Sequence, residues 1–86
     1  MVSSYNHTLC RESGALDSEE NKIYEYDYLK YKYSDYNRTF IGIVYYNEKL
    51  MQWRIKAIDK DNNMDWALHF IINNAAKVLI MGNQWE

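Results

Sequence analysis

The clearest alternation of apolar and polar residues lies between Phe40 and Asp59. Two runs rich in β-branched and aromatic residues flank a short polar break at residues 47–49, which is typical of a β-hairpin. In the second run, apolar and polar side chains alternate with the period of a strand, so one face is expected to be buried. That face carries Met51, Trp53, Ile55 and Ala57, and the opposite face carries Gln52, Arg54 and Lys56. Gly42 in the first run indicates a bulge or a place where another group packs tightly against the backbone.

Residues 22–33 permit two interpretations. As a strand, the segment places tyrosines on one face as far as Tyr28, and the stripe changes face near Leu29, which suggests a bulge. As a helix, it would begin with a capping box at Asp17 and Glu20. The high β-propensity of tyrosine favours the strand.

Residues 64–72 also fit two templates. A strand would align Met64, Trp66 and the apolar residues that follow at every second position, whereas a helix would align Asp65 with polar residues four positions apart. The preceding polar break, residues 59–63, resembles a hairpin loop and favours the strand. A C-terminal helix would then begin at Asn73 or Asn74 and end near Gly82.

Together these elements predict an α+β fold, in which an antiparallel β-meander of three to four strands packs against one C-terminal α-helix. Residues 1–21 are polar and have no regular period, so they are expected to form a loose, flexible N-terminal arm. Residues 22–86 would form a single small α+β domain, since a chain of 86 residues allows only one domain.

Composition narrows the functional classes. The formal net charge of −2 argues against a domain that mainly grips phosphate backbones, because such domains are usually basic. A single cysteine, Cys10, cannot form an internal disulfide, and the chain has neither a secretory signal pattern nor an apolar run of membrane-spanning length. We therefore expect a cytoplasmic protein, in the host cytoplasm if the source is viral. His7 and Cys10 offer too few ligands for zinc, so no metal or other cofactor is expected.

A family resemblance covers about residues 38–81. Gly42-Ile43 in the first strand, Trp53 in the second, Trp66 and Phe70 in the third and the pair Ala75-Ala76 stand in the order found in a known family. In this respect the chain resembles the plant ethylene-response-factor type of three-stranded DNA-binding domain, which is related to N-terminal domains of phage integrases. The resemblance implies three antiparallel strands, a C-terminal helix and DNA binding through the exposed sheet face.

The sequence contains no phosphate-binding glycine loop, nucleophile elbow or metal-ligand pattern, so no catalytic residue is expected and the protein is expected not to be an enzyme. The small size, acidic charge and high tyrosine content of the chain indicate a protein-binding module. Inhibitors that phages and mobile elements direct against host defence, of the anti-CRISPR or anti-restriction type, share this profile. Such an inhibitor would sterically block a basic nucleic-acid-binding surface of a host protein. The expected contact residues are Glu19, Glu20, Tyr24, Glu25, Tyr26, Asp27, Tyr28 and Tyr36.

Two alternatives remain open. A nucleic-acid-binding domain would use Arg38, Arg54 and Lys56 on the exposed sheet face. A structural subunit or homodimer would instead bury the tyrosines in a seam between copies.

Overall fold

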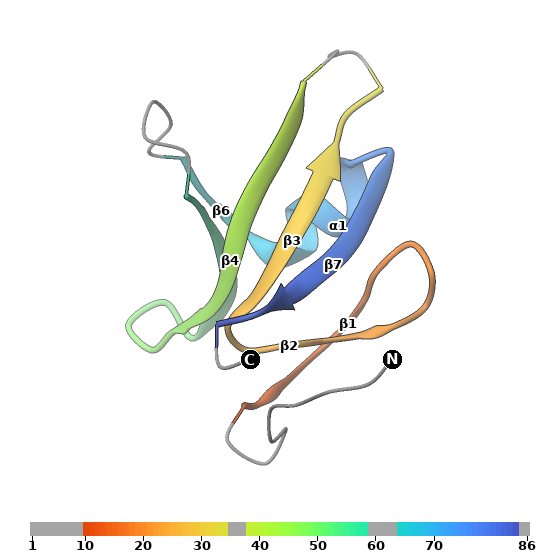
Figure 1. Cartoon of the computed structure of the whole chain (residues 1–86). Coiled ribbons are helices and arrows are strands. Elements are labelled where there is room, and N and C mark those ends of the chain that lie inside the picture. The colour runs from red at the N-terminus through yellow and green to blue at the C-terminus, as the bar shows by residue number, and fades with distance from the viewer. Residues whose placement is uncertain (1–9, 35–37, 59–63, 85–86) are drawn as a thin grey trace.

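The computed structural model describes residues 10–34, 38–58 and 64–84. A five-stranded antiparallel sheet has the strand order β6-β5-β4-β3-β7, and a separate hairpin pairs β1 with β2 (Figure 1). Of the described residues, 58% are in strands and 10% in a helix, so the predicted α+β class with three to four strands is wrong. The elements are β1 (Glu12–Leu16), β2 (Lys22–Tyr24), β3 (Asp27–Lys32), β4 (Thr39–Asn47), β5 (Gln52–Ala57), β6 (Asp65–Ala67), α1 (Leu68–Asn74) and β7 (Lys77–Asn83).

The predicted central hairpin is confirmed as β4 and β5. Its strands pair from Gly42 opposite Ala57 to Asn47 opposite Gln52. Ile55 and Ala57 are buried as expected, but Met51 is 80% exposed and its φ of 51° places it in the turn. The predicted inward orientation of Met51 is therefore wrong, because Met51 belongs to the loop and β5 begins only at Gln52.

Gly42 marks a close approach between the two strands. A Cβ atom at this position would lie 2.6 Å from Ile55 Cγ1 and 3.0 Å from the carbonyl oxygen of Lys56. Real Cβ atoms do not approach other atoms at 2.6 Å. Of the two expectations for Gly42, tight packing against the backbone is therefore the one observed.

The predicted C-terminal helix is wrong. The helix α1 is only seven residues long and lies earlier in the chain, and it ends where Ala75 adopts an extended conformation. Asn73 and Asn74 close α1 instead of opening a helix, and Gly82 lies in β7 opposite Tyr28. The segment 64–72 is divided between the strand β6 and the start of α1, so each of the two templates described one part of it.

The single strand predicted for residues 22–33 is also wrong. A tight turn at Glu25 and Tyr26, where Tyr26 has a φ of 69°, separates β2 from β3. The expected irregularity near Tyr28 and Leu29 is present, since the pairing of β3 with β7 shifts register there. The extra residue, however, is Met81 on β7.

Much of the expected N-terminal arm belongs to the fold. The strand β1 pairs with β2, and the loop between them covers the free edge of β7. In that loop the Ser18 N–H donates to the Val78 carbonyl at 2.8 Å, and the Val78 N–H donates to Ser18 Oγ at 2.8 Å. This pairing protects an edge strand from other chains. The loose arm is therefore wrong for residues 10–21, and residues 1–9 lie outside the described residues.

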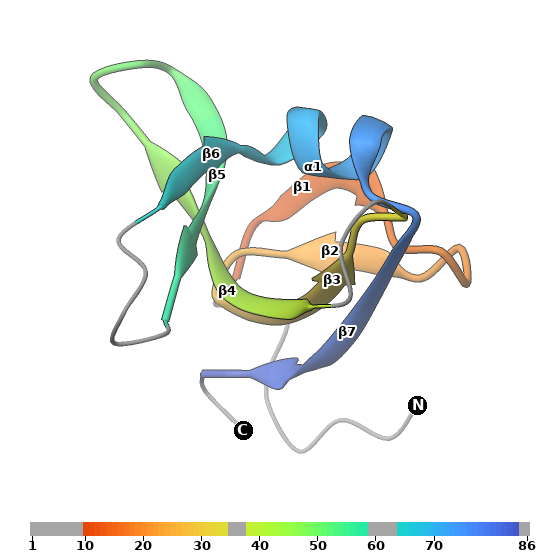
Figure 2. The ribbon, with the colours of Figure 1, turned by 90° about the horizontal axis from the view of Figure 1, so that it is seen from above.

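The five-stranded sheet is strongly curved, and α1 together with the β1–β2 hairpin fills its inner side (Figure 2). The core forms where the inner sheet face meets these two elements. We call the opposite side, which no described element covers, the outer face. The buried core residues are Ile23, Leu29, Tyr31, Val44, Ile55, Leu68, Ile71 and Val78.

Candidate functional site

The acidic part of the expected contact segment is not on the surface. Glu25 and Asp27 are only 7% and 1% exposed. The Glu25 carboxylate accepts hydrogen bonds from the Arg11 guanidinium, the shorter of them 2.7 Å long. This ion pair holds the pKa of Glu25 below its usual range and raises that of Arg11. Neither buried acid is placed to meet a basic groove on a partner.

Asp27 joins the β2–β3 turn to β7. Its carboxylate accepts hydrogen bonds from the Tyr24 N–H and from the Asn83 side-chain amide, both at 2.8 Å. The same amide donates to the Glu25 carbonyl at 3.1 Å. Cys10 lies against Asn83, and burial raises the pKa of its thiol. These contacts give Asp27 a structural role.

The other expected contact residues are scattered. Glu19 and Glu20 are exposed in the β1–β2 loop, whereas Tyr24 and Tyr26 are half-buried near the turn that follows β2. Tyr28 lies on the outer face of the sheet. Tyr36 lies outside the described residues. The structure therefore does not gather these side chains into one surface.

We expect Glu25→Gln to lower stability at neutral pH and to weaken its dependence on pH. Because the folded-state pKa of Glu25 is depressed, the ion pair contributes stability above the unfolded value of about 4.3 and loses it as the pH falls through the folded value. Urea unfolding of both proteins between about pH 7 and 3 measures this difference. Arg11→Gln keeps the buried carboxylate but removes its cation, so it should raise the pKa of Glu25 and lower stability more at neutral than at acid pH. Identical pH slopes for Glu25→Gln and the wild type would contradict the assignment.

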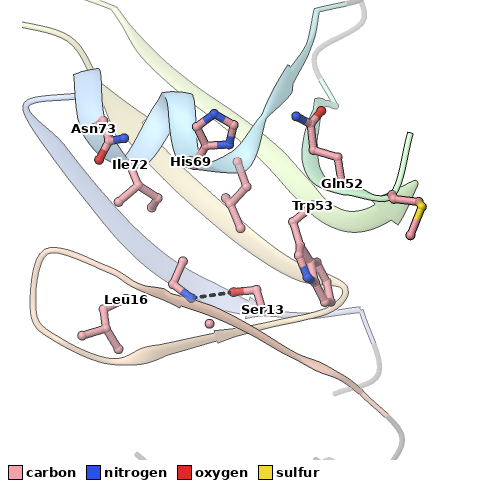
Figure 3. A pocket seen from close by; sticks show the side chains of 11 residues that line it. Ser13, Leu16, Gln52, Trp53, His69, Ile72 and Asn73 are labelled. Carbon is pink, nitrogen blue, oxygen red and sulfur yellow. Dashed lines mark hydrogen bonds between the residues drawn. The ribbon is translucent and has the colours of Figure 1, made fainter. Parts of the chain in front are cut away.

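The described residues form an apolar groove of about 580 Å³ between β1 and α1 (Figure 3). Ser13 and Leu16 come from one side and His69, Ile72 and Asn73 from the other, while Trp53 and Gln52 stand at one end. The remaining lining residues are Gly14, Ala15, Met51 and Leu68.

The wall that β1 contributes depends on a local distortion of the strand. Between Glu12 and Leu16 the pairing with β2 loses its regular register, and Gly14 has a φ of 83°. Ser13 Oγ stabilises the distortion by donating to the Ile23 carbonyl at 2.7 Å and accepting from the Ala15 N–H at 3.2 Å. A glycine is the residue that takes this backbone conformation without steric cost.

The end wall of the groove is held rigidly. The Trp53 ring packs edge-on against Tyr46 with their centroids 5.2 Å apart. The Arg11 guanidinium lies over both rings, 4.7 Å from the Tyr46 centroid and 5.5 Å from that of Trp53. Such cation–π and aromatic contacts fix a large side chain in one orientation. Trp53 is therefore a preorganised apolar contact.

Of the three basic residues expected to bind nucleic acid, the structure places two on the same face of β5 and the third elsewhere. Arg54 and Lys56 lie on the outer face, where Arg54 is bound to Asp65 at 2.6 Å and to Gln52 at 2.5 Å. The pair with Asp65 raises the pKa of Arg54. Lys56 is exposed, whereas Arg38 lies over the Phe40 ring at the start of β4, 5.2 Å from its centroid.

Asp65 also accepts a hydrogen bond from the Tyr45 hydroxyl. Burial and this carboxylate together raise the pKa of Tyr45. Because both oxygens of Asp65 are occupied by Arg54 and Tyr45, these three side chains form a closed polar cluster across β4, β5 and β6.

Sequence reasoning missed the groove and part of the basic outer face. Leu16 was assigned to an arm and Ile72 to a strand or helix, so nothing indicated that they would meet. Lys30 and Lys32 are two positions apart, a spacing that places both on one face of a strand, and this was the available signal for a basic surface. Lys77 joins them only because residues 77–83 form a strand.

No protein-family model, curated protein or solved structure matches the chain. The resemblance to three-stranded DNA-binding domains stays a prediction, although the fold that it implied is not the one observed. In the part of the chain that the structure describes, no helix is long and apolar enough to cross a membrane. Within the same residues, no group of three or more His, Cys, Asp or Glu side chains is placed to hold a metal ion.

Proposed function

We propose that the protein is a non-enzymatic protein-binding module that receives an apolar segment of a partner in the groove between β1 and α1. The observation that carries the proposal is the exposed apolar surface at this groove. Among its lining residues, Leu16 is 45% exposed and Met51 is 80% exposed, and Leu50, which precedes Met51 in the chain, is 58% exposed. Aromatic and aliphatic anchors of this kind are typical of the centres of protein interfaces.

Charge near the groove defines the partner further. Glu19 and Glu20 are exposed in the loop that follows Leu16. Basic residues flanking an apolar anchor on the partner would complement these carboxylates. This retains two of the acidic residues expected from the sequence. That the partner handles nucleic acid, and that binding inhibits a host defence system, stay predictions.

We expect the double variant Leu16→Asn, Met51→Asn to lose its protein partner while remaining folded. Both side chains are exposed, and asparagine tolerates the left-handed backbone of Met51. The matched control is Met81→Asn, which removes a methionine that is 56% exposed on β7, outside the groove. Affinity capture from a host lysate treated with nuclease, followed by mass spectrometry, compares the three proteins.

A groove partner should be depleted about tenfold or more with the double variant, which corresponds to a loss of about 1.4 kcal/mol, and should be retained with Met81→Asn. Equal capture by the double variant and the wild type would refute the groove as the binding site. Loss of all captured proteins on nuclease treatment would refute direct protein binding.

A further inference from the structure

The outer face of the sheet carries a group of lysines that the net charge conceals. Side chains of cross-strand partners point to the same side of a sheet, so the pairings locate them. Lys30 and Lys32 alternate with the buried Leu29 and Tyr31 on β3 and therefore point outward. Lys77 is the partner of Lys32 on β7, and Lys56 on β5 is separated from β3 by a single strand. We call Lys30, Lys32, Lys56 and Lys77, which are all exposed, the lysine face.

The arrangement of these lysines is unfavourable for the isolated protein. Lys32 and Lys77 are direct cross-strand partners, so two positively charged side chains project to the same side from Cα atoms that are about 5 Å apart. Lys30 follows on the same side of β3. Among the described strand residues of the outer face, Asp65 is the only acid, and it already holds Arg54. A polyanion bound across the lysine face would relieve this repulsion.

The charges of the molecule are segregated. On the outer face, the four lysines and Arg54 stand against one carboxylate, which gives a local charge of +4. The β1–β2 hairpin, residues 11–24, carries two cations against four acids and is therefore net negative. A compact domain with opposite signs on two sides orients an anionic ligand toward its basic face.

The centre of the outer face can accept bases as well as phosphates. Ile41 and Ile43 of β4 lie between the lysines of β3 and Lys56 of β5, and Tyr28 and Tyr45 lie on the same side. All four side chains are half-buried, so part of each apolar surface is open to solvent. Single-stranded nucleic acid combines a phosphate chain with unpaired bases that pack on aromatic and apolar side chains. A duplex would present its phosphates but keep its bases stacked.

We infer that the lysine face binds single-stranded nucleic acid, with phosphates at the lysines and bases over Ile41, Ile43 and Tyr28. This activity is separate from the protein-binding groove, which lies on the other side of the sheet. Each lysine that contacts a phosphate contributes about 0.7 to the slope of log affinity against log salt. Up to four contacts give an expected slope of about −2 to −3 and weak binding at physiological salt.

Fluorescence anisotropy with labelled oligo-dT and oligo-U of about 20 nucleotides, titrated between about 50 and 200 mM salt, tests the inference. The variant is Lys32→Gln, Lys77→Gln. It should bind about tenfold more weakly at the lowest salt and lower the magnitude of the slope by about 1.4. The matched control is Lys22→Gln, Lys49→Gln, which removes the same charge from exposed lysines of β2 and the β4–β5 loop. It should change affinity less than about twofold.

Two further arms separate the ligand classes. Tighter binding of a duplex hairpin than of the single strands, or equal binding of anionic phospholipid vesicles, would overturn the inference, as would no binding at the lowest salt. If the control variant and the lysine-face variant weaken binding equally, the attraction depends only on overall charge, and the lysine face is not the binding site.

The groove variant Leu16→Asn, Met51→Asn should bind the oligonucleotides as the wild type does. A melting temperature of the lysine-face variant at or above that of the wild type verifies its folding, because it removes a like-charge pair.

Discussion

Gly42→Ala is expected to destabilise the protein by about 2–3 kcal/mol, although it adds only one methyl group. That methyl carbon would lie 2.6 Å from Ile55 Cγ1 and 3.0 Å from a backbone carbonyl oxygen. Ile55 is fully buried in the core, so it has no empty space into which to rotate. Urea unfolding at constant pH measures the loss, and the melting temperature should fall by about 10 °C.

A double-mutant cycle identifies the cause of this loss. Ile55→Ala removes the clashing Cγ1 atom and by itself costs about 2–5 kcal/mol. The combination Gly42→Ala, Ile55→Ala should cost at least about 1 kcal/mol less than the sum of the two single changes. Gly14→Ala is the control, because no atom lies within 4 Å of its added Cβ and its effect should add to that of Ile55→Ala. Additivity of the Gly42 pair would show that the close approach is not the cause.

The β4–β5 hairpin could be predicted because its information is local. The strands are joined by a short loop, and Ile55 and Ala57 alternate with polar residues at the strand period. Gly42 interrupts a run of otherwise bulky residues, and the side chain that packs against it, Ile55, belongs to the next strand. Sequence patterns of this range are sufficient to predict the pairing, and they reduced Gly42 to two possibilities, of which tight packing is the one observed.

The strand β7 could not be predicted in the same way. Its partner β3 lies more than forty residues earlier, and the apolar run from Val78 to Met81 fits a helix face as well as a buried strand. The strand β1 was missed for another reason. Its distortion at Gly14 breaks the alternation by which a strand is recognised. Both strands are defined by pairing with distant or irregular partners and not by their own composition.

The candidate surfaces depend on those same distant pairings. The groove exists because β1 lies beside α1, and the closest lysine pair exists because β7 returns beside β3. The burial of Glu25 and Asp27 also depends on partners distant in sequence, Arg11 and Asn83. From composition alone an acidic tyrosine segment resembles a contact surface, since charged residues are rarely buried unless they are paired. The pairing partners were not apparent from the sequence.

Asp27→Ala is expected to cost about 2–4 kcal/mol, because it empties a fully buried site and removes an acceptor that two donors share. These donors are the Tyr24 N–H in the turn and the side-chain amide of Asn83 on β7. Asp27→Asn keeps the shape but has one oxygen in place of two, so it should cost less than Asp27→Ala and more than zero. Urea unfolding ranks the three proteins, and a change below about 0.5 kcal/mol for Asp27→Ala would contradict the role of this carboxylate.

The same variant separates a structural role of Asp27 from the contact role that its sequence suggested. At a temperature where Asp27→Ala is still folded, it should capture the same protein partners as the wild type, because its side chain is 1% exposed. A contact residue would instead lose partners without losing stability, as expected for Leu16→Asn, Met51→Asn. Loss of binding by folded Asp27→Ala would mean that the β2–β3 turn touches the partner, and the interface would then lie at this turn and not at the groove.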